Sequence, residues 1–391
     1  MVDALIAHYD EIGLKGGNRH RFEDQLMANL KRALRATGYR RVRCEVGRIT
    51  VDFKLPDLVS EAAASAACVF GVANVGAGLR VEPDLASIGN AALELMTEGS
   101  FDSFAVRARR ARSSCPVDSR HIERSVGGMI QERTGAPVDL ENPDATLYVE
   151  LFSNSGLAYR DRRPGSGGLP VGTSGKLIAL MSGGIDSPVA AWRMMRRGAE
   201  VELLHFHGRP YTDASSVTQA FDLSRALSRY HLATTLHLVP LGDAQAEVVA
   251  HCPPRLRLLL YRRLMLRIAA ALADERDAAG LVTGDSLGQV SSQTLDNLAT
   301  TDAAVRDRQV LRPLIGTDKL EIVRQAEAIG TLQISNRRHQ ESCVLFDARS
   351  TSTHTSVGQA EDAEGRLDIG GLVGKALARR ESQVVEAMAS R

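Results

Sequence analysis

The second half of the chain alternates short apolar runs with longer segments in which apolar residues recur every three or four positions. This alternation is typical of a parallel sheet covered by helices on both faces. A last helix is expected in the tail, at 370–390. Ligands of such folds bind beyond the carboxyl ends of the strands. The strands are expected at 176–181, 201–206, 234–241, 280–285 and 310–314, and the helices between them at 187–198, 220–230, 255–275, 286–299 and 318–330.

The first half has a mixed pattern. Apolar runs at 4–10 and 49–53 surround an amphipathic helical segment at 21–38. Further strands are expected at 101–107 and 147–152, with a helix at 121–135 between them. This order predicts α+β organisation in two small units. A Pro-, Gly- and Ser-rich stretch at 163–175 separates them from the second half and is typical of a linker.

Composition narrows the class of protein only slightly. A chain of 391 residues with 44% hydrophobic residues and a net charge of +1 is ordinary for a globular protein of two or three domains. The five cysteines are far apart, with no C-x-x-C pair, which argues against a disulfide framework or a zinc site. No signal peptide or membrane-spanning run is present, so we expect a cytoplasmic protein with no membrane partner.

The strongest local signal is "LIALMSGGIDSPVAAW" at 177–192, which predicts a strand, a glycine-rich loop and a helix start. Gly183 and Gly184 let the backbone approach a ligand closely, and Ser182, Ser187 and the helix N-terminus can bind an anion. Neither the Walker A pattern nor G-x-G-x-x-G fits. The remaining pattern, S-G-G-x-D-S, resembles the PP-loop of ATP pyrophosphatases, with Asp186 as a carboxylate for Mg²⁺ beside the phosphates.

Longer segments resemble one PP-loop family along the whole chain. Residues 168–207, 282–294 and 311–331 are similar to the tRNA 4-thiouridine synthetases (tRNA sulfurtransferases), as is the opening "YDEIGLKGGNR" at 9–19. The resemblance implies a short form without a rhodanese domain. It also implies a fold class: a parallel-sheet α/β PP-loop domain preceded by α+β ferredoxin-like and THUMP domains. The implied ranges are 1–58 (ferredoxin-like), 59–164 (THUMP), 165–175 (linker) and 176–391 (PP-loop domain).

The same resemblance implies the nucleotide site and the reaction. ATP would activate uridine 8 of tRNA at O4, and sulfur would then replace that oxygen to give 4-thiouridine. Physical chemistry agrees at three positions, since Gly284 permits close approach, Gln293 has donors and an acceptor, and Arg262 can neutralise phosphate. The implied ATP contacts, beyond Ser182, Gly183, Gly184, Asp186 and Ser187 of the loop, are Leu180, Met181, His205, Phe206, Arg262, Gly284 and Gln293.

The sulfur chemistry is expected to depend on Cys343 in "HQESCVLFDA", which matches the cysteine that the family uses. A thiolate can act both as nucleophile and as persulfide carrier. The sulfur would come from a cysteine desulfurase or another persulfide donor. The resemblance also implies a homodimer and a weaker link to thiamine thiazole synthesis.

Basic clusters in the first half are candidates for tRNA contacts. Arg107, Arg109, Arg110 and Arg112 form the favoured patch, because arginines on phosphates supply affinity without reading sequence. Yet residues 1–172 hold 22 Lys and Arg against 22 Asp and Glu, so ordinary solvated surface explains the patch equally well. Two alternative functions stay open: another PP-loop tRNA-modifying enzyme, and a non-catalytic tRNA-binding THUMP protein.

Overall fold

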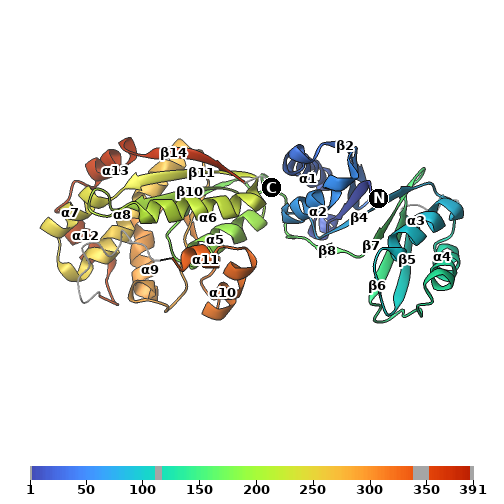
Figure 1. Cartoon of the computed structure of the whole chain (residues 1–391). Coiled ribbons are helices and arrows are strands. Elements are labelled where there is room, and N and C mark those ends of the chain that lie inside the picture. The colour runs from blue at the N-terminus through green and yellow to red at the C-terminus, as the bar shows by residue number, and fades with distance from the viewer. Residues whose placement is uncertain (1, 111–116, 338–351, 388–391) are drawn as a thin grey trace. The chain divides into compact units, whose positions relative to one another are not determined.

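The structure is a computed structural model that describes residues 2–110, 117–337 and 352–387. It divides into two compact units, one up to Pro170 and the other from Val171. Figure 1 shows both, with the first in blue to green and the second in green to red.

The second unit contains a mostly parallel sheet in the order β13-β12-β9-β10-β11-β14. The helices α5 and α6 contact one another and the central strands, and α8 contacts α13 and the same sheet, so helices flank β9 and β10 (Figure 1). The expected α/β class is confirmed. Its strands are β9 (Lys176–Leu180), β10 (Glu200–His207), β11 (Ala233–Pro240), β12 (Gly280–Val282), β13 (Gln309–Leu311) and β14 (Glu381–Glu386). Its helices are α5 (Asp186–Arg196), α6 (Ser215–His231), α7 (Gly242–His251), α8 (Arg257–Glu275), α9 (Leu295–Asp302), α10 (Lys319–Ala328), α11 (Leu332–Ser335), α12 (Val357–Glu364) and α13 (Ile369–Ala378).

Two expected helices of this unit are wrong in part. The helix expected at 286–299 is a loop and a short 3₁₀ turn (Ser291–Gln293), because Gly288 has φ +72° and α9 begins only after its cap, Thr294. The tail is expected to form one helix, but α13 ends at Ala378 and the chain continues as the strand β14. That strand pairs antiparallel with β11 and buries Val385, so pairing at the sheet edge prevails over helical periodicity.

The first unit contains one continuous sheet in the order β2-β3-β1-β4-β7-β6-β5, with β8 paired to β4. Its α+β class is confirmed. The two expected small units share this sheet through β4, which pairs with both β1 and β7. The strands are β1 (Ala4–His8), β2 (Tyr39–Glu45), β3 (Arg48–Phe53), β4 (Asn74–Val81), β5 (Phe104–Arg110), β6 (Ala145–Leu151), β7 (Gly156–Arg160) and β8 (Arg163–Pro164); the helices are α1 (Arg19–Ala33), α2 (Val59–Cys68), α3 (Leu85–Thr97) and α4 (Ser119–Thr134).

Alternation along β4 shows that all four helices lie on one face of this sheet. Val75 and Ala77 pack in a core with α1 and α2, and Leu79 and Val81 pack in a second core with α3 and α4. Because residues two apart in a strand point to the same face, the two cores lie on the same side. The opposite face carries a small cluster around Ile6, Phe152 and Tyr159 to which no described helix contributes. The exact domain boundaries, including the one after residue 58, stay predictions.

Candidate functional site

The carboxyl ends of β9, β10 and β12 border a cavity of about 230 Å³. Parallel pairing of β9 with β10 and with β12 brings the three strand ends to one edge of the sheet. Of the expected nucleotide residues, the cavity is lined by Leu180, Met181, Ser182, Gly183, Asp186, Ser187, His205, Phe206, Arg262, Gly284 and Gln293. Gly184 belongs to the same loop but not to the lining. Segments more than 100 residues apart in the chain therefore meet where the fold class predicts a ligand site.

The glycine-rich loop is closed by its two serines. The backbone N–H of Ser182 donates to Ser187 Oγ at 2.9 Å, and the N–H of Gly184 donates to Ser182 Oγ at 3.2 Å. Helix α5 begins at Asp186, so its N-terminus and positive dipole end lie directly after the loop. Carbonyls of the loop are held from outside, by Gln219 of α6 at 3.2 Å and by Ser335 of α11 at 3.3 Å.

Gly284 is required by backbone packing. A Cβ there would lie 2.7 Å from Ser187 N and 2.9 Å from Ser187 Cα. The segment after β12 thus packs directly on the first turn of α5. Gly284 therefore makes its close approach to α5, the helix that follows the glycine-rich loop, and it also lines the cavity.

One buried histidine of the cavity ties together the ends of the central strands β9 and β10. His205 is buried at the end of β10, and its Nδ1 donates to the carbonyl of Met181 at 2.9 Å. Leu180, Met181 and Phe206 supply apolar surface beside it. This part of the cavity suits a flat, largely apolar group.

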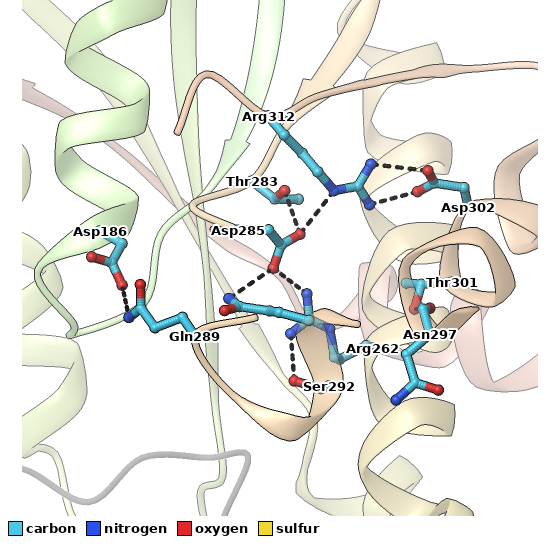
Figure 2. A network of polar contacts seen from close by, with 11 residues as sticks. Asp186, Arg262, Thr283, Asp285, Gln289, Ser292, Asn297, Thr301, Asp302 and Arg312 are labelled. Carbon is cyan, nitrogen blue, oxygen red and sulfur yellow. Dashed lines mark hydrogen bonds and ion pairs between the residues drawn. The ribbon is translucent and has the colours of Figure 1, made fainter. Parts of the chain in front are cut away.

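Asp186 is held by two side chains that the sequence analysis did not anticipate. Lys319 Nζ lies 2.5 Å from one carboxylate oxygen, and Gln289 Nε2 donates to the other at 2.9 Å. Figure 2 shows Gln289 reaching Asp186 from the loop after β12. Arg193 of α5 donates to the carbonyl of Pro313 at 2.9 Å and thereby ties α5 to the segment before α10. The signal in the sequence that could have pointed to Lys319 is its place in 311–331, one of the segments that resemble the 4-thiouridine synthetases.

A second carboxylate, Asp285, organises the other side of the cavity (Figure 2). It is 4% exposed and forms ion pairs with Arg262 and with Arg312, the latter at 3.1 Å. Burial alone would raise the pKa of Asp285, but Arg262, followed by Thr283 and Arg312, holds that pKa at about 2. Asp285 is therefore ionised at neutral pH, and its charge offsets the two arginines.

Cys343 lies outside the described residues. The described residues before it end at Arg337, which pairs with Asp222. They begin again at Ser352, whose carbonyl accepts a hydrogen bond from Asn297 at 3.0 Å. None of the described cysteines lines the cavity.

The candidate RNA patch is divided between two faces of the first unit's sheet. Arg107 and Arg109 alternate with Val106 and Ala108, which pack under α4, so these two arginines lie on the face without helices. Arg110 pairs with Asp118 at the start of α4, at 3.0 Å. Arg112 lies outside the described residues.

Two further arginines of the helix-free face, Arg48 and Arg162, gather around the buried carboxylate of Glu150. Glu150, 1% exposed, accepts from His8 at 2.8 Å, from Tyr159 at 2.7 Å and from Arg162 at 3.2 Å, and also pairs with Arg48. Burial, together with Arg162 and Arg48, lowers the pKa of His8 to about 4.

Two tyrosines form the aromatic part of this face. Tyr148 stacks on Tyr159 with 5.2 Å between ring centroids, and Arg162 lies over the Tyr148 ring at 4.0 Å. Tyr148 and Tyr159 lie opposite one another because β6 pairs antiparallel with β7.

Among the described ranges, no helix is both long and apolar enough to cross a membrane. Within the same ranges, no three His, Cys, Asp or Glu side chains converge as a metal site.

Comparison with known proteins identifies relatives of the whole chain. The model of the thiamine biosynthesis protein (ThiI) family matches residues 172–369, the ThiI ferredoxin-like domain matches 4–76, and the THUMP domain matches 82–157. A probable tRNA sulfurtransferase of Thermus thermophilus is 42% identical over 380 residues, which is 96% of this chain and 92% of the relative. One from Caldanaerobacter subterraneus subsp. tengcongensis is 39% identical over 369 residues, 94% of this chain and 96% of the relative.

A solved structure is also similar over its full length. The crystal structure of a 4-thiouridine synthetase–RNA complex with bound ATP has a TM-score of 0.90 at 35% identity, covering 99% of this chain and 100% of that chain.

Proposed function

Because the chain belongs to the ThiI family of tRNA sulfurtransferases, we propose that it is an ATP-dependent enzyme that converts uridine 8 of tRNA to 4-thiouridine. One observation carries the proposal: the glycine-rich loop, the strand ends and Arg262, far apart in the sequence, line one cavity. The related synthetase was solved with ATP and RNA bound.

The cavity fits ATP in both of its halves. The apolar surface of Leu180, Met181 and Phe206 suits the adenine ring, and the loop and the start of α5 suit the phosphates. Arg262 would face the phosphates from α8. The implied contacts of His205, Gly284 and Gln293 fit the same placement.

Asp186 and Lys319 are assigned to the step that releases pyrophosphate. With no protein-only metal site in the described residues, a Mg²⁺ ion would take most of its ligands from phosphates and water, and Asp186 fits as its carboxylate. Lys319, paired with Asp186, would lie beside the same phosphates and could neutralise charge on the leaving pyrophosphate. Asp186 and Lys319 thus act on the bond that breaks between the α and β phosphates.

Sulfur enters in the second step. O4 of uridine attacks the α phosphate and pyrophosphate leaves, so that O4 departs later with AMP. The terminal sulfur of a persulfide on Cys343 attacks C4 and the C4–O4 bond breaks, which releases AMP and leaves Cys343 joined to C4 through two sulfurs. A further thiol then attacks the Cys343 sulfur, forms a disulfide with it and releases 4-thiouridine; an external thiol reduces that disulfide. A cysteine desulfurase or another persulfide donor supplies the sulfur. We retain a homodimer and a cytoplasmic location as predictions, because no described contact bears on either.

The RNA surface is assigned to the helix-free face of the first unit. Arg107 and Arg109 lie there with Arg48, Arg80 and Arg162. Arginines on phosphates give strong, salt-dependent affinity. If this assignment holds, Arg107→Ala or Arg109→Ala weakens tRNA binding and lowers the slope of log K against log salt by about 1. Arg110→Ala is the matched control, because that side chain pairs with Asp118 on the other face.

Reconstitution tests the proposed reaction. Purified protein, unmodified tRNA, MgATP, a cysteine desulfurase with cysteine, and a thiol reductant are expected to form AMP and 4-thiouridine in equal amounts. Asp186→Asn should abolish both products. Cys343→Ser should abolish thiolation while tRNA-dependent pyrophosphate release persists, and Cys44→Ser, at an exposed site, is the control.

The same assay distinguishes the alternatives. A non-catalytic tRNA-binding protein would form no AMP. Another PP-loop enzyme would form AMP without 4-thiouridine.

A further inference from the structure

We propose that Asp285 is a positioning residue for the nucleotide, which fixes Arg262 and Gln293 in the orientation that binds ATP. The inference rests on the proposed function, since it assumes that this cavity takes ATP. Asp285 itself would not contact the phosphates; it would act through the two side chains that do.

Both oxygens of the Asp285 carboxylate are occupied by protein donors. Oδ1 accepts from Arg262 Nη2 and from Gln293 Nε2, the latter at 3.2 Å. Oδ2 accepts from Thr283 Oγ1 at 2.7 Å and from Arg312 Nε at 3.1 Å. The four donors come from α8, from β12's exit, from the 3₁₀ turn and from the segment after β13, so one carboxylate joins four separate pieces of the cavity wall (Figure 2).

The two arginines differ in what they leave for a ligand. All three nitrogens of Arg312 bind carboxylates: the two terminal nitrogens bind Asp302, at 2.9 and 2.6 Å, and Nε binds Asp285, so the two N–H groups left over sit on nitrogens that Asp302 already holds. Arg262 uses two N–H groups, toward Asp285 and toward Ser292 at 3.0 Å, in the part of the chain that the structure describes. Three of its five N–H groups remain for an anion in the cavity that it lines. Arg312 therefore holds the Asp285 carboxylate in place, and that carboxylate orients Arg262.

A purely electrostatic role makes the opposite prediction. Removing a negative charge beside two arginines would increase positive potential in the cavity and tighten the binding of a polyanion. A positioning role weakens binding, because a mobile Arg262 must be ordered again when ATP binds. The sign of the change therefore separates the two explanations.

The test is a double-mutant cycle on the dissociation constant of α,β-methylene ATP, which cannot be split between the α and β phosphates, measured by calorimetry with the full chain. We expect Asp285→Asn and Arg262→Met each to raise the Kd about tenfold, and the double variant to bind no more than two- to threefold more weakly than Arg262→Met alone. Asp302→Asn is the matched charge control: it removes a carboxylate beside Arg312 but leaves Asp285 in contact with Arg262, so it should change the Kd much less than Asp285→Asn does.

Thr283→Val is the second variant, in case Asp285→Asn does not fold. It removes one hydrogen bond to Asp285 and should raise the Kd by a smaller factor that disappears in the Arg262→Met background. An unchanged or lower Kd for Asp285→Asn, or effects that multiply in the double variant, would overturn the inference. If the unaltered protein does not bind the analogue, the proposed function itself fails, which is a distinct result.

Discussion

Replacing Gly284 with alanine tests whether the packing of β12's exit on α5 sets the position of the glycine-rich loop. The new Cβ would lie 2.7 Å from Ser187 N, whereas ordinary contacts begin at 3.4 Å. The neighbouring atoms are backbone, so no side chain can rotate away, and the start of α5 and the segment after β12 must separate by about 0.7 Å. Overpacking of this kind costs about 1–3 kcal/mol of unfolding free energy.

The effect on activity should exceed the effect on stability. Because a displacement approaching 1 Å in a catalytic site can cost about 100-fold in rate, we expect AMP formation by Gly284→Ala to fall by about 10- to 100-fold at a temperature where the variant stays folded. Urea unfolding and a radiolabelled AMP assay measure the two quantities. Gly316→Ala is the control, because its Cβ would meet nothing within 4 Å. A variant with normal rate and normal stability would refute the packing argument.

Three further predictions concern buried charges. Glu202 is 4% exposed, and although burial opposes ionisation, His237 and Arg276 hold its pKa at about 2, so Glu202→Gln should cost on the order of 2–3 kcal/mol at pH 7. That difference should shrink as pH falls from about 4.5 to 2 in urea titrations; a constant difference would contradict the assignment. The pKa of His8 is lowered from 6.5 to about 4, so the unfolded state takes up a proton first as pH falls, and the wild type should lose about 2 kcal/mol more than His8→Gln between pH 8 and pH 5. Equal losses would show that His8 is not held neutral. Arg263 is fully buried and shares Glu364 with Arg267, so Arg263→Leu should cost about 3 kcal/mol in urea unfolding, at the lower end for a buried ion pair because Glu364 keeps Arg267. Replacing all three charged residues (Arg263→Leu, Glu364→Leu and Arg267→Met) should recover much of that loss; a triple variant as unstable as Arg263→Leu would argue against a buried ion-pair network.

The parts of the fold with strong apolar runs could be predicted from the sequence. The strands β9 to β12 and the helix α8 lie close to their expected ranges, because burial on both faces leaves a nearly continuous apolar signal. The loop after β12 and the strand β14 could not be predicted, since a left-handed Gly288 and pairing with β11 decide them. Neither feature leaves a periodic pattern of apolar residues in the sequence.

The site divides in the same way. The glycine-rich loop is one contiguous segment, so its motif alone locates it. Lys319 and Arg312 are linked to the site by contacts with Asp186 and Asp285, made across more than 20 residues of chain. The shared sheet face of Arg107, Tyr148 and Tyr159 likewise depends on strand pairing. Contacts of this kind follow from tertiary structure and have no local pattern.

The most direct test of the central claim is nucleoside mass spectrometry of tRNA from a strain that lacks this protein. We predict that 4-thiouridine disappears from the tRNA, returns when the natural chain is supplied, and stays absent with Asp186→Asn, whose carboxylate contacts Lys319 in the proposed ATP site. Persistence of 4-thiouridine in the deletion strain, or its full recovery with Asp186→Asn, would contradict the account.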